Sequence, residues 1–265
     1  MSLTDEQKEI RRTRIGSTDI AAIVALYRPE LAHLAKKQNA TDVWLRLVHG
    51  VTQKQNSSMS RGIRVEPILR ETYRAIIGPL PDPPGTLVHN IFNFACASPD
   101  GLTSNMVVEF KTCSNWIKDR WGEPSTDKIP DDYNLQVQWI LEVCNRSSAQ
   151  IMVAFGDDVK DDSGADFFNI TGTSCYIVNK SEDLCLDLLK KANDFTDEYV
   201  ASDMPPPMAP LHNKRIFKRI IKENKNGNYS EWVDRNAALA KLNSEAERST
   251  GESTALDIGS EEGIS

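Results

Sequence analysis

The sequence lacks the segments that mark membrane-bound and exported proteins. None of its apolar stretches approaches the roughly 18 residues that would suggest a membrane span. Residues 1–8 lack the apolar core of a signal peptide. We therefore expect a protein that makes no membrane contact and stays in the cytoplasm, where it is made.

The cysteine and histidine patterns of common metal sites are also missing. The five cysteines are scattered and include no Cys-x-x-Cys pair, which argues against a zinc site or an iron–sulfur cluster. An odd count in a chain without a signal peptide indicates reduced, mostly buried thiols. The four histidines form no spaced cluster. One acidic group lacks the glycine and final glutamate of a calcium loop, which predicts a solvated turn; it consists of Asp157, Asp158, Asp161 and Asp162.

The chain has no positive net charge, which would be common in a DNA-binding protein. Its formal net charge is −7. Residues 242–265 contain six acidic residues and one arginine, a net charge of −5, which leaves −2 for the rest of the chain. A body so close to neutral can still present a basic face. The candidates for that face are Arg11, Arg12, Arg14 and residues 214–225.

What the sequence does contain is an ordinary globular composition, 40% hydrophobic and 26% charged, with alternating helix and strand patterns. We expect helices at residues 4–14, 17–24, 41–50, 61–77, 130–144 and 181–199. Ser17 or Thr18 would cap the second helix, and Thr41 the third. Runs at 87–90, 92–97 and 106–113 predict an antiparallel meander, and further strands are expected at 150–156, 167–170 and 176–178. This order predicts an α/β core with helical decoration.

The prolines of residues 204–210 predict the end of the compact domain. We therefore expect one domain over residues 1–210. Residues 214–222 are basic and helical, residues 229–247 suit another helix, and we assign 211–248 to a basic helical extension. Residues 249–265 are rich in serine, glycine and glutamate, which predicts an acidic, disordered tail.

The most informative pattern is an aspartate after a turn signal, followed nine residues later by Glu-x-Lys in a strand. Strand side chains alternate between faces, so Glu109 and Lys111 point the same way. Asp100 lies in the turn before them. Charges on a central strand need partners or a metal, and two carboxylates beside an ammonium suit Mg²⁺-dependent cleavage of a phosphodiester. The alternative is a turn aspartate beside an exposed strand face.

Other residues near this pattern each have a plain structural interpretation. Glu66 and Gln136 would be ordinary helix surface if taken alone. Ser17 and Thr18 would be helix caps. A free helix N-terminus also binds phosphate, and arginines just upstream add charge-assisted contacts. The residues leave the cap and the phosphate anchor equally open.

These motifs occur in series over residues 11–207: Ile15-Gly16-Ser17-Thr18-Asp19, Trp44, Gly62-x3-Glu66-Pro67, Tyr73, Ser98-Pro99-Asp100-Gly101-Leu102, Glu109-Phe110-Lys111-Thr112 and Tyr133-x2-Gln136-Val137-Gln138. The series resembles the phage lambda exonuclease-like (YqaJ-type) viral recombinase family of the PD-(D/E)xK nuclease superfamily. The resemblance implies a restriction-endonuclease-like α+β core, a central mixed β-sheet flanked by helices. The first motif departs from the usual Gly-Ser or Ala-Ser, but Ser17-Thr18 keeps a hydroxyl.

The resemblance implies a Mg²⁺-dependent 5′→3′ exonuclease, with Mn²⁺ as a substitute ion. Its substrate would be double-stranded DNA ends, digested to 3′ single-stranded overhangs for recombination by strand annealing. It also implies a homotrimeric ring, a single-strand annealing protein as partner, and the cytoplasm of a bacterium or phage-infected host.

Site roles follow from the resemblance by position. Asp100, Glu109 and the main-chain carbonyl of Phe110 would hold metal, with Glu66 as a further acidic residue from a helix. Lys111 would orient or activate the attacking water, and Gln136 would position water or the scissile phosphate. The residues implied to hold the 5′-phosphate are Arg11 and Thr18, with Ser17 and Arg14 as neighbouring candidates.

Two other functions remain open at this point. The first is another nuclease of the superfamily; the absence of clustered cysteines disfavours a Cas4-like enzyme, and the residue 133–138 motif disfavours a sequence-specific endonuclease. The second is a non-catalytic protein that binds DNA ends. The intact trio of Asp100, Glu109 and Lys111 counts against it, because binding alone does not require that trio.

Overall fold

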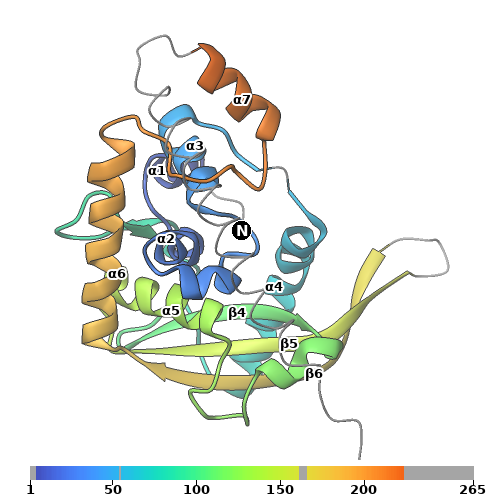
Figure 1. Ribbon diagram of the computed structural model, residues 1–265. Coiled ribbons are helices and arrows are strands. Elements are labelled where there is room, and N and C mark those ends of the chain that lie inside the picture. The colour runs from blue at the N-terminus through green and yellow to red at the C-terminus, as the bar shows by residue number, and fades with distance from the viewer. Residues whose placement is uncertain (1–3, 54, 161–165, 224–265) are drawn as a thin grey trace, which may run out of the picture.

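A four-stranded sheet carries helices on both faces and lies in the lower part of Figure 1, with most of the helices above it. The computed structural model describes residues 4–53, 55–160 and 166–223. In spatial order the strands are β3 (Gly101–Leu102), β4 (Met106–Ser114), β5 (Ser148–Lys160) and β6 (Asp166–Asn179). β4 pairs with β5 in parallel, and the other neighbours are antiparallel. The predicted mixed sheet is therefore confirmed.

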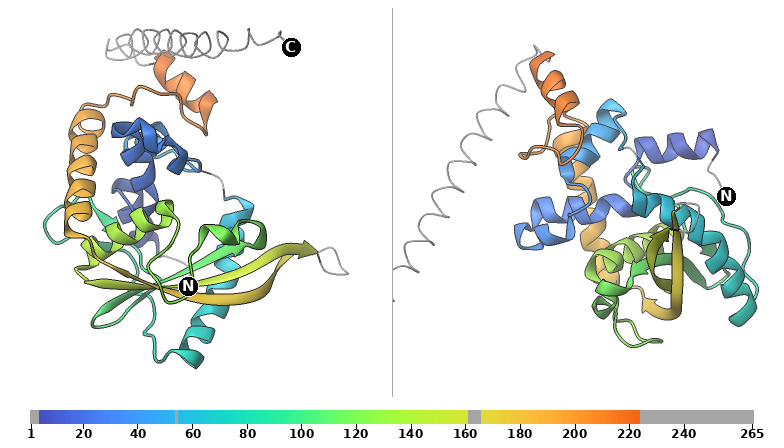
Figure 2. Two further views of the ribbon diagram at one scale, coloured as in Figure 1. Left: turned by 60° about the horizontal axis from the view of Figure 1, so that its bottom comes forward. Right: turned by 90° about the vertical axis from the view of Figure 1, so that its right-hand side faces the viewer.

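The helices precede, cross over and follow this sheet (Figures 1 and 2). They are α1 (Asp5–Thr13), α2 (Ile20–Tyr27), α3 (Ala40–His49), α4 (Ser57–Ile76), α5 (Asp131–Cys144), α6 (Glu182–Phe195) and α7 (Lys214–Glu223). Short 3₁₀ segments are η1 (Ser17–Asp19), η2 (Pro29–Leu34) and η3 (Asn115–Arg120), and a π-helical turn, η4 (Thr196–Val200), extends α6. None of the helices in these described ranges has the length and apolarity needed to cross a membrane.

The two faces of the sheet contact different helices. Val108 and Phe110 of β4 pack with Val65 and Leu69 of α4 in the smaller core cluster. The opposite face packs against α2, α5 and α6 in the main core, to which Val107 contributes. Because strand side chains alternate, Glu109 and Lys111 point to the α5 face. The pleat of β4 thus directs the charged pair toward α5.

Most expected elements are confirmed, but two strand predictions were wrong. The first two runs do not join β4 in a meander; they shrink to β1 (Leu87–Val88) and β2 (Cys96–Ala97), which form a separate pair. The neighbour that precedes β4 is instead the two-residue β3. The two runs expected at 167–170 and 176–178 form the single strand β6, since β5 pairs with them and with the polar residues between.

The predicted helix caps were also partly wrong. Asn39 caps α3 through the N–H groups of Thr41 and Asp42, and Thr41 instead donates its hydroxyl to the Met208 carbonyl. Neither Ser17 nor Thr18 caps α2, because η1 intervenes. The expected stop is confirmed at Gly50, which adopts a left-handed conformation with φ of 65°.

The expected acidic turn was wrong for Asp157 and Asp158, which belong to β5, where Asp158 pairs with Arg61 at 2.8 Å. The other members of that group, Asp161 and Asp162, lie outside the described residues. The helix at 229–247 and the tail at 249–265 lie wholly outside them. The basic helix expected at 214–222 is confirmed as α7. The domain boundary near residue 210 stays a prediction.

Candidate active site

Asp100, Glu109 and Lys111 meet where β4 loses its partner β3. The Phe110 N–H donates to Asp100 Oδ2 at 2.7 Å, so the aspartate occupies a β4 edge position that β3 is too short to reach. Lys111 Nζ donates to Glu109 Oε2 at 2.7 Å. The Asp100 N–H lies 3.4 Å from Glu109 Oε1. The structure therefore brings together the trio that the sequence pattern indicated.

Burial makes the charges of this trio interdependent. Burial and the neighbouring charge of Glu109 raise the pKa of Asp100 to about 8, against the lowering effect of Lys111. Burial alone would lower the pKa of Lys111, but the charges of Glu109 and Asp100 outweigh it and raise that pKa. The lysine is thus held as an ammonium, whereas the two carboxylates repel one another and favour an added cation.

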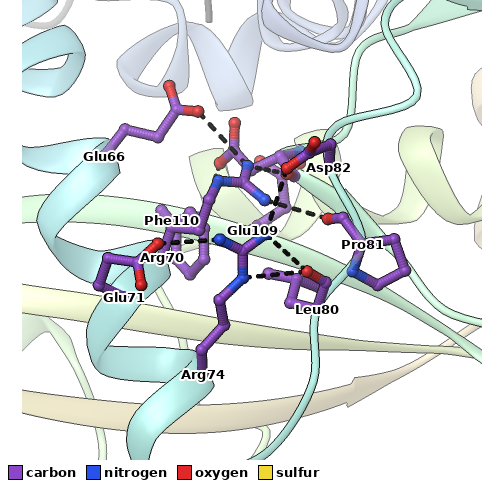
Figure 3. Close-up of polar contacts among 10 residues, drawn as sticks. Glu66, Arg70, Glu71, Arg74, Leu80, Pro81, Asp82, Glu109 and Phe110 are labelled. Atoms are coloured by element: carbon purple, nitrogen blue, oxygen red, sulfur yellow. Dashed lines mark hydrogen bonds and ion pairs between the residues drawn. The ribbon is translucent and has the colours of Figure 1, made fainter.

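A fourth charged residue, Arg70 of α4, joins the site without having been predicted. Figure 3 shows its guanidinium between the Glu66 carboxylate and the Pro81 carbonyl. It donates to the Asp100 main-chain carbonyl, pairs with Glu66 at 3.6 Å and lies over the Phe110 ring at 5.5 Å. Arg70 therefore ties α4 to the aspartate turn. The sequence signal was the Glu66-x3-Arg70 spacing, which places both residues on one helix face.

Helix α5 covers the other side of the trio. The Lys111 ammonium lies 5.7 Å from the centre of the Tyr133 ring, a cation–π contact. Gln136 is buried and lies three residues after Tyr133, which is nearly one helical turn. It therefore lies on the same side of α5 as Tyr133, the side that faces β4. Tyr133 belongs to a motif that was recognised in the sequence, but only the structure shows that its ring contacts the lysine.

The second glutamine of that motif has a structural task. Gln138 is buried; its amide donates to the Asn179 carbonyl at 2.9 Å and accepts from the Ser181 N–H at 2.8 Å. It therefore fastens α5 to the junction between β6 and α6.

An arginine of α3 bonds several main-chain groups of the N-terminal segment, which lies beside α5. Arg46 donates to the main-chain carbonyls of Arg11, Arg12 and Arg14, and its guanidinium pairs with buried Asp19 at 2.6 Å. Asp19 also accepts from the Gly16 N–H at 2.7 Å. These contacts fix the backbone that presents the predicted phosphate-binding residues.

The side chains of that segment differ in their availability. The Arg14 guanidinium donates to the Asn93 main chain and side chain, and Arg12 pairs with Glu9. Arg11 is exposed and its guanidinium forms no ion pair within the described ranges. The hydroxyls of Ser17 and Thr18 likewise form no hydrogen bond to any other described residue.

Lys37 and Gln38 link the N-terminal segment to the trio. The Gln38 amide donates to the Thr18 carbonyl at 2.9 Å and to Asp19 at 3.0 Å. The neighbouring Lys37 ammonium lies 5.1 Å from the centre of the same Tyr133 ring that faces Lys111. The two groups of predicted residues are therefore connected through one tyrosine.

The oxygen donors at the trio suit a hard divalent cation. Asp100 and Glu109 supply carboxylates, and the Phe110 carbonyl comes from the same strand. Glu66 is turned toward Arg70. Among the residues described here, no three acidic, histidine or cysteine side chains form a complete metal-binding group. The oxygen donors fit magnesium, and two carboxylates, those of Asp100 and Glu109, lie close enough together to share one ion.

Comparison with known proteins shows the family of the chain that carries this site. Residues 6–147 match the family model described as the YqaJ-like viral recombinase domain, which is more than half of the chain. The chain belongs to the YqaJ-like viral recombinase family. The matched segment contains the trio, Glu66, Arg70, Arg46 and the α5 glutamines, so the whole candidate site of this YqaJ-like chain lies inside it. A search of curated proteins gave no match.

Solved structures share the fold of this YqaJ-like chain. An alkaline exonuclease, LHK-Exo from Laribacter hongkongensis, is 20% identical with a TM-score of 0.54 over 82% of this chain and 97% of its own. LHK-Exo in complex with dAMP gives the same identity and score over 75% and 94%. A phage-related exonuclease from Haemophilus somnus 129PT is 12% identical, with a TM-score of 0.50 over 73% and 98%. At these identities the likeness concerns the fold.

Proposed function

We propose that this protein is a Mg²⁺-dependent 5′→3′ exonuclease that digests one strand of linear double-stranded DNA and leaves 3′ overhangs for strand annealing. The observation that carries the proposal is the packing of Asp100, Glu109 and Lys111 at the end of β3, with the pKa of Asp100 raised by burial and by Glu109. Membership of the viral recombinase family and the exonuclease fold neighbours support it.

Asp100, Glu109 and the Phe110 carbonyl would hold the metal, and Glu66 would add a carboxylate after leaving Arg70. A bound Mg²⁺, or Mn²⁺ in its place, supplies Lewis-acid polarisation of the phosphate and acidifies bound water. Its positive charge would also relieve the repulsion between the carboxylates of Asp100 and Glu109.

Lys111 and Gln136 would act on the water and the phosphate. The raised pKa keeps Lys111 protonated, so it stabilises negative charge that develops on the phosphate and orients the attacking water. Gln136, on the same face of α5 as Tyr133, would position the water or the scissile phosphate by hydrogen bonds. Tyr133 limits the mobility of the Lys111 ammonium by a cation–π contact.

The 5′-phosphate would bind at the N-terminal segment. Arg11 and the hydroxyls of Ser17 and Thr18 are the groups left without partners among the described side chains. Arg14 is a weaker candidate, because its guanidinium already binds Asn93. A phosphorylated end held here would direct the enzyme to termini rather than to internal bonds.

We further propose that the enzyme works as a homotrimeric ring together with a single-strand annealing protein, in the cytoplasm of a bacterium or phage-infected cell. The YqaJ-like viral recombinase family supports a role in DNA recombination. A ring would keep the duplex enclosed during successive cleavages.

One experiment tests the activity. Linear duplex DNA with and without 5′-phosphates is incubated with the protein in Mg²⁺, in Mn²⁺ or in EDTA. We expect mononucleotide release that requires metal and is faster from 5′-phosphorylated ends. Cutting of closed circular DNA would instead indicate another PD-(D/E)xK endonuclease. End binding without hydrolysis would indicate a non-catalytic DNA-end-binding protein.

Replacement of the lysine provides the sharpest variant. Lys111→Ala should lower the cleavage rate by roughly 100-fold or more, because it removes charge stabilisation made mainly in the transition state. DNA binding, measured by anisotropy in EDTA, should change little. Lys128→Ala removes an exposed lysine from the loop before α5 and is the matched control. A wild-type rate in Lys111→Ala would exclude the assigned role.

A further inference from the structure

Helix α7 presents a dense basic face that the catalytic site does not use. Its ten residues include five cations and one acid, and all five cations are exposed: Lys214, Arg215, Lys218, Arg219 and Lys222. None of them forms an ion pair with another described residue. A cluster of unpaired cations on one short helix is suited to a polyanion.

The opposite face of α7 is packed on the body, so the cations have fixed positions. Phe217 is 4% exposed and meets the Trp44 ring edge to face at 6.4 Å between centres. Ile220 and Ile221 pack against the same core. Figures 1 and 2 place α7 beyond α3, away from the sheet. The helix is therefore amphipathic in the usual sense, with its apolar stripe inward.

The segment before α7 is tied to the start of α3. The Asp42 carboxylate accepts from the N–H groups of Leu211 and His212 at 3.0 and 2.9 Å. Thr41 donates to the Met208 carbonyl at 2.6 Å. These bonds fix the direction in which α7 leaves the body, so the basic face has a defined position relative to α3.

A line of contacts connects α7 with the trio. The His212 ring lies 2.8 Å from the Lys37 carbonyl. The Lys37 ammonium lies over Tyr133, whose ring also faces Lys111. The contacts thus run from His212, two residues before α7, through Lys37 and the Tyr133 ring to Lys111.

We infer that the basic face of α7, together with Lys37, binds the phosphate backbone of DNA outside the cleavage site. The inference rests on the proposed function for the identity of the polyanion. Binding would be independent of base sequence, since contacts of lysine and arginine with phosphates carry no sequence information. Its role would be to hold the duplex on the enzyme between cleavages.

The test measures binding without turnover. Fluorescence anisotropy of a 5′-phosphorylated 30-base-pair duplex is recorded in EDTA at several NaCl concentrations. The variant combines Lys218→Gln, Arg219→Gln and Lys222→Gln. Each lost phosphate contact should lower the slope of log affinity against log salt by about 0.9, so a total loss of about 2 to 3 is expected. Affinity at low salt should fall by about tenfold or more, equally for different sequences.

A matched control removes three exposed lysines elsewhere. The variant Lys8→Gln, Lys160→Gln and Lys190→Gln changes the net charge equally on α1, β5 and α6, and breaks only exposed ion pairs. It should keep the wild-type slope. Circular dichroism and thermal melting check that both variants are folded.

The outcomes separate this inference from the proposed nuclease. An unchanged salt slope in the α7 variant overturns the inference, even if the wild type digests DNA. A reduced slope supports it, even if no hydrolysis is found. Unchanged DNA binding with lost retention on immobilised polyglutamate would assign the face to an acidic protein and also overturn the inference.

Discussion

At the scale of single residues, two arginines organise the site from a distance. Arg70 holds the Asp100 carbonyl and Glu66, and Arg46 holds three main-chain carbonyls at the end of α1. Arginine suits both tasks, because its planar guanidinium donates several hydrogen bonds in fixed directions. Neither side chain needs to touch the reacting phosphate to affect how it is bound.

Arg46 should therefore determine how well the enzyme distinguishes DNA ends. In Arg46→Met the backbone that presents Arg11, Ser17 and Thr18 loses three of its hydrogen bonds, and Asp19 loses its charged partner. We expect the ratio of kcat/KM for 5′-phosphate over 5′-hydroxyl ends to fall by about tenfold, equivalent to about 1.4 kcal/mol. Single-turnover rates on both substrates give the ratio.

Arg28→Met is the control, because Arg28 is an exposed arginine that pairs with half-buried Asp187 at 3.1 Å. Arg46→Lys should recover part of the preference, since it restores the charge beside Asp19 without the forked donors. An unchanged end preference in a folded Arg46→Met would show that the N-terminal segment plays no part in recognising the phosphate.

Single residues also show what the sequence could reveal. Asp100, Glu109 and Lys111 lie within twelve positions, so strand alternation alone brings two of them together. Arg70 and Arg46 act on backbone carbonyls 30 and 32 to 35 positions away. A carbonyl has no signature in the sequence, so such contacts become visible only in the fold.

At the scale of elements, the long hairpin of β5 and β6 depends on one glycine. The pairing shifts by one residue between Phe155 and Gly156, which is a β-bulge. A methyl group on Gly156 would lie 2.1 Å from the Asn169 carbonyl oxygen, whereas one on Gly172 would meet nothing within 4 Å. Only the first glycine is therefore required by close backbone approach.

Gly156→Ala should lower the free energy of unfolding by about 1 to 3 kcal/mol, because the clash involves backbone that cannot rotate away. Gly172→Ala, in the partner strand, should change it by less than about 0.5 kcal/mol. Urea denaturation of both variants provides the comparison. Equal stability of the two variants would contradict the assigned bulge.

The strands and helix caps that were predicted wrongly from the sequence also have a physical explanation. The polar residues Thr171, Thr173 and Ser174 made β6 resemble two strands, yet β6 pairs with β5 on both sides of the bulge at Thr171. Backbone pairing therefore outweighed side-chain pattern. Likewise Asn39 and Asn56, rather than the first residues of the apolar patterns, cap α3 and α4. Helices with strong periodicity, such as α5 and α6, were located well.

At the scale of the whole molecule, the proposed ring predicts a mass. The chain has a mass of 29.6 kDa, so a homotrimer would have three times that mass. We expect this mass at micromolar concentration, with and without duplex DNA. Sedimentation velocity would measure it, and a chain that remains monomeric in both conditions would contradict the ring while leaving the site chemistry untouched.

The parallel pairing of β4 with β5 has a consequence for the order of events during synthesis. Every residue proposed to act in cleavage or to hold the 5′-phosphate lies before residue 148, where β5 begins. Until β5 leaves the ribosome, β4 has only the two residues of β3 beside it in this sheet. We therefore expect nascent chains to carry all the reactive side chains without the support that assembles them. The site would then assemble only after more than half of the chain has been synthesised.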